Sequence, residues 1–127
     1  MSLFRPLFGT ALAASALLSG CVSEEGATER RGNLIAQIFP EPLDRQGLFL
    51  AFPLESGGGL GSLEVIWFES EVTQGEVVHR VQGACARTPT PGFTGQVGIA
   101  KDLGTTTIDT TSGPRTARQV FFKCLTA

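Results

Sequence analysis

Apolar runs in this chain are short, and glycine, proline or serine interrupts them at almost regular intervals. Sixteen glycines and seven prolines occur among its 127 residues. Short apolar segments bounded by such residues are typical of strands and turns. We interpret the following segments as strands: 33–39, 47–54, 63–71, 76–86, 96–100, 104–110 and 116–125. The sequence therefore predicts an all-β fold, a small antiparallel sandwich or barrel of about six to seven short strands.

The segment 47–54 differs from the other predicted strands because both of its faces are apolar. Successive residues point to opposite sides of a strand. Five consecutive apolar residues therefore place apolar side chains on both sides: Leu48, Phe49, Leu50, Ala51 and Phe52. We expect this strand to lie in the centre of the sheet or to be covered on both sides. Residues 73–75 are expected to form a hairpin turn.

The N-terminus has the pattern of an export signal. Residues 1–5 carry one positive charge and no acid, and residues 6–18 contain no charged residue. This apolar run is too short for a comfortable transmembrane span, which needs about 20 residues. No other segment approaches that length, so the chain after the signal is not expected to be an integral membrane protein.

The apolar run ends in Leu18-Ser19-Gly20-Cys21, which resembles the lipobox of bacterial lipoproteins. The resemblance covers only the residues up to Cys21. It implies cleavage between Gly20 and Cys21 and lipidation of Cys21, whose thiol is alkylated by a diacylglycerol. Two or three acyl chains hold a protein firmly on a membrane. Val22 follows in place of aspartate, which by resemblance to enteric lipoproteins favours the outer membrane over the inner, with the chain facing the periplasm.

These features divide the chain into three parts. Residues 1–20 are the predicted signal peptide, residues 21–32 the lipidated cysteine with a flexible tether, and residues 33–127 a single β-domain. A polar tether of this length spans roughly 18 Å on average, which keeps the domain close to the membrane. A short helix from Glu29 to Phe39, interrupted at Gly32, is the alternative to the tether.

Two cysteines remain after Cys21 is assigned to lipid. Cys85 and Cys124 both end predicted strands and lie on the apolar side under strict alternation. Disulfides form and persist in the compartment to which such a signal leads. We therefore predict a structural disulfide between them, which would stabilise the fold by roughly 4 kcal/mol in the chain-entropy model. Two buried free thiols or a redox pair are the alternatives, and the redox pair lacks a Cys-x-x-Cys motif.

Candidate catalytic residues are few. His79 is the only histidine, and its position between Val77 and Val81 predicts a structural side chain that points inward or toward a sheet end. A zinc site is not expected with one histidine and no spare thiol. A glycosidase needs two carboxylates flanking a cleft. The glutamates near the first predicted hairpin are more typical of exposed edge positions, and they are Glu64, Glu69, Glu71 and Glu76.

Three further segments have a ligand-binding interpretation that we do not favour. Residues 56–62 are glycine-rich but lack the lysine and the helix of a phosphate loop. The threonines of 104–112 suit a strand, and a single copy makes no repeated array. Trp67 and the phenylalanines could form a binding patch, but most phenylalanines follow strand patterns and are expected in the core.

The absence of a catalytic constellation from the sequence favours a binding protein over an enzyme. Twelve acidic and ten basic side chains give a net charge of −2, and no basic stripe is present. Nucleic-acid binding is therefore not expected, nor is a cofactor or metal. We expect a non-catalytic interaction or accessory lipoprotein of the bacterial envelope, attached to the membrane through Cys21, with an envelope protein as possible partner. The alternative is an inhibitor or binder of a periplasmic hydrolase, and a small enzyme is the least favoured.

Overall fold

The computed structural model describes residues 24–54, 60–88 and 90–127. The chain separates into two units, 1–30 and 31–127. The first is described only from residue 24, where helix α2 begins. The predicted lipidation site at Cys21 therefore lies outside the described residues, as does most of the glycine-rich loop 56–62.

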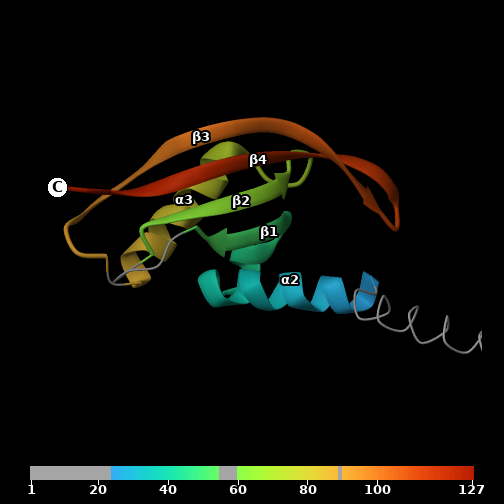
Figure 1. Ribbon diagram of the computed structural model, residues 1–127, viewed down its shortest axis with the longest axis horizontal. Coiled ribbons are helices and arrows are strands. Elements are labelled where there is room, and N and C mark those ends of the chain that lie inside the picture. The colour runs from blue at the N-terminus through green and yellow to red at the C-terminus, as the bar shows by residue number, and fades with distance from the viewer. Residues whose placement is uncertain (1–23, 55–59, 89) are drawn as a thin grey trace, which may run out of the picture. The chain divides into compact units, whose positions relative to one another are not determined.

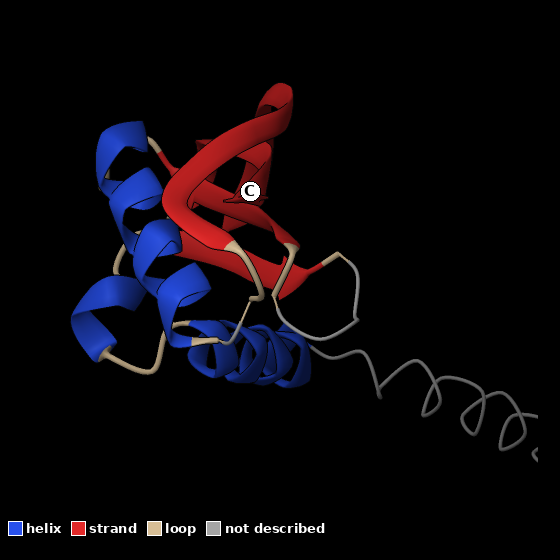
Figure 2. Cartoon of the chain, turned by 90° about the vertical axis from the view of Figure 1, so that its left-hand side faces the viewer, coloured by secondary structure: helices blue, strands red, loops and turns tan. Residues whose placement is uncertain are grey.

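The second unit consists of one antiparallel sheet with a helix packed on one of its faces (Figures 1 and 2). The elements of the described chain are α2 (Glu24–Ile38), the 3-10 helix η1 (Pro42–Arg45), β1 (Leu48–Pro53), β2 (Ser62–Phe68), α3 (Gln74–Arg87), β3 (Phe93–Thr110) and β4 (Gly113–Thr126). The strand order in the sheet is β1-β2-β4-β3. Helix α3 connects β2 to β3, so these two strands are not neighbours.

The predicted antiparallel β-architecture is therefore correct only in outline. The described chain contains four strands in an open sheet, not six to seven strands in a sandwich or barrel. Two α-helices occur where strands or a tether were predicted. Because β4 lies between β2 and β3, the strands do not follow one another across the sheet in chain order.

Helix α3 replaces the predicted strand 76–86 and the hairpin turn before it. The hydroxyl of Thr73 caps the helix by accepting a hydrogen bond from the backbone N–H of Glu76. Buried residues of the helix recur at intervals that place them on one helical face: Val77, Val81, Ala84 and Cys85. The same residues also fit partial alternation, which is why a short apolar run can be mistaken for a strand.

Helix α2 occupies the segment predicted as a tether followed by a strand. Residues 24–32 are helical, and the helix continues through the predicted strand 33–39 as far as Ile38. Its last turns bury Ile35, Ile38 and Phe39 in the core of the second unit. Spacing of three to four residues brings apolar side chains to one face of a helix. The alternative helix that the sequence suggested was therefore closer to the structure, although Gly32 does not interrupt it.

Strand β3 joins two predicted strands into one of 18 residues. Its pairing with β4 shifts register at three places, each of which is a bulge or irregularity. One shift lies beside Gly104, whose φ of +84° favours glycine. The side chain of Asp102 accepts a hydrogen bond from the Gly104 N–H at 2.8 Å. The glycine therefore bends a continuous strand where the sequence suggested a break.

The core lies between the sheet and the helices. Its largest fully buried side chains are Trp67, Phe39 and Phe122. The Trp67 and Phe122 rings come from neighbouring strands, with centroids 6.2 Å apart. Alternate residues of β2 and β4 contribute the remaining sheet side of this core, namely Leu63, Val65, Val120 and Cys124. We call this side of the sheet the covered face.

Strand β1 lies at one edge of the sheet, so the first of the two alternatives expected for it, a central position, is wrong. Ala51 points into the core, whereas Phe49 and Leu50 belong to a second, smaller apolar cluster on the opposite side of the sheet. The apolar residues on both faces of this strand therefore correspond to apolar clusters on both sides of the sheet. Only one of those surfaces lies against helix α3.

Candidate functional site: the open face of the sheet

The side of the sheet opposite helix α3 is the most extensive candidate binding surface of the second unit. We call it the open face. In the two views, α3 lies on one side of the sheet only (Figures 1 and 2). Strand alternation assigns to the open face Phe49, Leu50 and Phe52 of β1, Glu64, Ile66 and Phe68 of β2, and Arg115, Ala117, Gln119, Phe121, Lys123 and Leu125 of β4.

The antiparallel register aligns these side chains in rows across the four strands. Phe52 pairs with Glu64, and Glu64 pairs with Phe121. Phe121 in turn pairs with Lys101 of β3. Residues opposite one another in an antiparallel sheet project to the same side. One row therefore carries two aromatic rings, one carboxylate and one ammonium group.

Aromatic rings cluster at the β1 side of the open face. The Phe49 and Phe68 rings meet edge to face, with centroids 5.9 Å apart. Arg31 of α2 lies over the Phe49 ring at 4.3 Å, and Arg115 of β4 lies over the Phe68 ring at 4.0 Å. Both distances suit cation–π attraction. The arginines partly cover this cluster and leave Phe52 and Phe121 as the half-buried rings outside it.

The single carboxylate of the open face is withdrawn from solvent. Glu64 is only 7% exposed, and it is the one buried polar or charged residue in the described chain. Its carboxylate accepts a hydrogen bond from the side-chain amide of Gln119. A buried carboxylate needs such a partner because the loss of hydration is costly. Glu64 therefore acts as part of the sheet and not as an exposed acid.

Basic and acidic residues of the strands are distributed unequally between the two faces. The open face has three cations and one acid, which are Lys101, Arg115, Lys123 and Glu64. The covered side has one cation and two acids, which are Arg118, Asp102 and Asp109. The chain contains two lysines, and both project from the open face. No basic cluster is visible in the sequence because Lys101 lies on β3, while Arg115 and Lys123 are eight residues apart on β4.

The predicted glutamate cluster assembles in part, at the turn between β2 and α3. Glu69, Glu71 and Glu76 line an open hollow of about 330 Å³, together with Arg80. Each glutamate has an arginine partner: Arg118 for Glu69, Arg115 for Glu71 and Arg80 for Glu76. Glu64 lies apart from the hollow, in the sheet. The arrangement connects the β4 strand to the turn and leaves no pair of unpartnered carboxylates there.

Arg118 and Asp102 form an ion pair that shifts the pKa of both groups. Their side chains meet at 2.8 Å, while Arg118 also reaches Glu69 at 3.3 Å. The hydrogen bond from Arg118 holds the pKa of Asp102 below its ordinary value, and the Gly104 N–H lowers it further. The same bond raises the pKa of Arg118. Both partners are therefore held in their charged forms.

His79 lies on the exposed side of helix α3, so the prediction that it points inward is wrong. Residues two apart share the face of a strand but lie about 200° apart around a helix. Val77 and Val81 are four residues apart, which is roughly one helical turn, so they lie on the same face of α3 and both are fully buried. Within the described residues, the imidazole forms no hydrogen bond or ion pair with a glutamate, and the nearby Glu76 is paired with Arg80.

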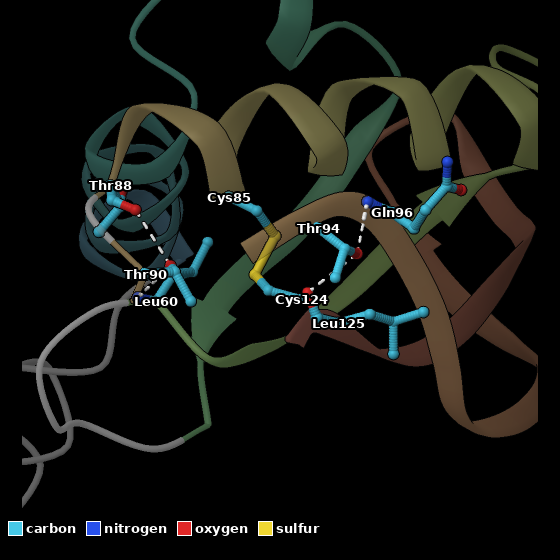
Figure 3. The surroundings of a disulfide bond; sticks show 8 residues. All are labelled: Leu60, Cys85, Thr88, Thr90, Thr94, Gln96, Cys124 and Leu125. Atoms are coloured by element: carbon cyan, nitrogen blue, oxygen red, sulfur yellow. Dashed lines mark hydrogen bonds between the residues drawn. A yellow bond between two sulfur atoms is a disulfide. The ribbon is translucent and has the colours of Figure 1, made fainter. Parts of the chain in front are cut away.

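The predicted disulfide is confirmed. Cys85 of α3 and Cys124 of β4 are bonded, with Cα atoms 5.9 Å apart. Figure 3 shows the bond directly between helix and strand. Both residues are almost completely buried. Cys85 sits on a helix and not on a facing strand, so the pairing prediction was right although one of the two elements was misassigned. The disulfide attaches α3 to the covered face.

Aromatic residues divide between core and surface in a way that sequence alone could not resolve. Trp67 is wholly buried, so it belongs to the core and not to a binding patch.

The threonines of β3 and β4 do not form one platform, because Thr105 and Thr106 pair with Arg118 and Ala117 on opposite sides. The signal for the open face was present in the two-sided apolar pattern of β1.

Within the described residues, no group of three or more His, Cys, Asp or Glu side chains is placed to hold a metal ion. The described helices include none that is both long and apolar enough to span a bilayer. No protein-family model, no curated protein and no solved structure matches this chain. The functional argument therefore depends on the geometry of its own residues.

Proposed function

We propose that this chain is a lipid-anchored accessory protein of the bacterial envelope, which acts by binding and not by catalysis. The signal peptide 1–20 is removed, Cys21 carries the lipid, and the domain faces the periplasm from the outer membrane. The open face of the sheet is the binding surface. The observation that carries the proposal is the concentration of partly exposed phenylalanine and lysine side chains on this face.

Packing supports a binding role for the open face. Monomeric domains seldom leave a contiguous apolar surface uncovered unless it contacts a partner. Phe52 and Phe121 are half-buried, and Leu125, four residues along β4 from Phe121, is 37% exposed. The two sheet edges are poor candidates in comparison. Strand β1 is short and ends in Pro53, and β3 contains three register shifts, both of which discourage the addition of another strand.

The charged groups support a non-catalytic role. The carboxylates of the hollow each contact an arginine, and His79 lies on the outer side of α3. General acid–base catalysis requires a proton donor or acceptor within hydrogen-bond reach of the substrate. The ion pairs of Arg115 and Arg118 hold the β2–α3 turn against β4, so these carboxylates have a structural role.

Acylation is tested by metabolic labelling with a clickable fatty acid. The wild-type chain is expected to incorporate the label at Cys21 and to migrate as the processed form. Cys21→Ser is expected to lose the label and to accumulate as precursor, because the peptidase acts after the thiol is alkylated. The Cys85→Ala, Cys124→Ala double variant serves as control and should label normally. Continued labelling of Cys21→Ser would overturn the anchor.

The binding role is tested by photo-crosslinking in cells. A photoreactive amino acid in place of Phe121 is expected to form adducts with an envelope component, whereas the same group in place of His79 should not. Equal results at both positions would contradict a binding role for the open face. An adduct with a periplasmic hydrolase at position 121 would favour the inhibitor or hydrolase binder, which is the alternative function.

A further inference from the structure

We infer that the open face docks on the surface of an anionic lipid bilayer. The inference depends on the proposed function, since it names the partner of the same face. A surface that lies on a bilayer needs apolar side chains for the acyl boundary and cations for the headgroups. Phe52, Phe121 and Leu125 supply the first, and Lys101 and Lys123 supply the second.

The apolar side chains and the lysines are interleaved. Phe121 has Lys101 beside it on β3 and Lys123 two residues further along β4. Leu125 follows Lys123 by two residues, and its side chain points away from helix α3 (Figure 3). Lysine can lay its aliphatic stem along an apolar surface while its ammonium group reaches polar headgroups. Neither lysine forms an ion pair within the described chain.

The charge asymmetry of the sheet favours an anionic partner. Three of the four cations in the strands lie on the open face. Arg115 is paired with Glu71, which leaves Lys101 and Lys123 without an acidic partner in the described chain, and the one strand acid of this face, Glu64, is buried and bonded to Gln119. Two of the three strand acids lie on the other side, where Asp102 is paired with Arg118. A second copy of the chain would place the same positive charges opposite one another, so face-to-face self-association is disfavoured.

The position of the anchor favours a membrane over a distant partner. Arg31 is the first residue of the second unit, and it lies over the Phe49 ring on the open face. Arg31 follows Cys21 by ten positions in the sequence, and even a fully extended chain of that length reaches at most about 35 Å. An acylated Cys21 would hold the open face within reach of the headgroups.

The test uses the acylated full-length protein in vesicles and an environment-sensitive dye on a single introduced cysteine. The native cysteines are occupied by lipid or by the disulfide, so Leu125→Cys is labelled alone. In vesicles of phosphatidylcholine and phosphatidylglycerol, this dye is expected to shift to the blue and to be quenched by lipid-borne quenchers. The matched control, His79→Cys on the exposed side of α3, is expected to remain aqueous.

Charge variants test the role of the lysines. Lys101→Gln with Lys123→Gln is expected to reduce the docked fraction, at about fivefold in the docking equilibrium for each lysine. Gln74→Glu with Gln82→Glu changes the net charge by the same amount on α3 and is expected to have little effect. Replacing phosphatidylglycerol by phosphatidylcholine, or adding salt, should mimic the lysine variant, because screening weakens such attractions.

Three results would overturn the inference. The Leu125 dye could stay as aqueous as the His79 dye in anionic vesicles. The dye could instead become buried in neutral vesicles to an extent that rises with the amount of protein per vesicle, which would indicate that a second copy of the chain covers the open face. Crosslinks from position 121 in cells could join only protein, which would indicate an acidic protein segment as partner. In that last case, the binding role of the open face stands, whereas an absent acyl chain on Cys21 would overturn the anchor itself.

Discussion

The two faces of the sheet are made from alternate residues of the same strands, yet they have different consequences for the protein. Phe122 lies on the covered face and is fully buried, while its neighbour Phe121 lies on the open face and is half-buried. The covered face has a helix and a disulfide over it, and the open face has two arginines over its aromatic cluster. The comparison shows that the covered face holds the larger buried core, whereas the open face has a smaller apolar cluster and carries the proposed binding surface.

The largest expected effect comes from replacing each of the two neighbouring phenylalanines of β4 by alanine in a separate variant. Phe122→Ala removes a core ring that contacts Trp67 and should lower the free energy of unfolding by about 3–5 kcal/mol. Phe121→Ala should lower it by about 1 kcal/mol or less, since a half-buried ring leaves a smaller cavity. Chemical denaturation monitored by circular dichroism measures both. Similar losses for the two variants would show that the open face is part of the core.

Removal of the disulfide tests whether the covered face depends on its covalent link to α3. Replacing Cys85 and Cys124 by alanine should lower the free energy of unfolding by about 2–5 kcal/mol. Docking of the open face should persist at temperatures where the variant remains folded, because the bond lies on the other side of the sheet. Denaturation of the wild type with and without reductant provides the matched measurement. Loss of docking by a folded variant would mean that the two faces are coupled.

The smallest expected effect concerns the ion pair of Asp102 with Arg118 on the covered side. Folding lowers the pKa of Asp102 below its ordinary value of 3.8. The pair therefore contributes stability above about pH 4 and loses that contribution as the pH falls through the folded pKa. Asp102→Asn should lie below the wild type at pH 5–7 and converge with it near pH 2. Denaturation midpoints across this range measure the difference, and parallel curves would contradict the role of the pair.

The disulfide and the strands around it show how much of the fold was predictable. Cys85 and Cys124 were paired correctly because compartment and apolar position both favoured a bond. Strand β1 falls within a predicted strand segment, and β2 and β4 overlap the predicted segments 63–71 and 116–125 but begin earlier. Helix α3 was missed because the buried residues Val77 and Val81 fit two periodicities over a short run. The N-terminal cap at Thr73 favours the helical periodicity over the strand periodicity, although Thr73 was assigned to a hairpin turn.

Only the apolar side chains of the open face were predictable from the sequence. The two-sided pattern of residues 48–52 indicated two apolar surfaces, which the structure contains. The lysines could not be assigned to it, because Lys101 and Lys123 are 22 residues apart and meet only through the pairing of β3 with β4. The position of Glu64 beside Phe121 likewise depends on the register between β2 and β4. Strand order and register are long-range properties that local patterns do not encode.

The sequence by itself determined the local features of this protein: the pattern of the N-terminal signal, the two cysteines able to pair, and the short apolar segments that became strands. Tertiary structure alone decided which of those segments became helix, because burial of one helical face against the sheet outweighs a weak local preference. It also decided which side chains share a surface. Strand pairing collected the phenylalanines and both lysines on the open face, because residues in register project to the same side of a sheet.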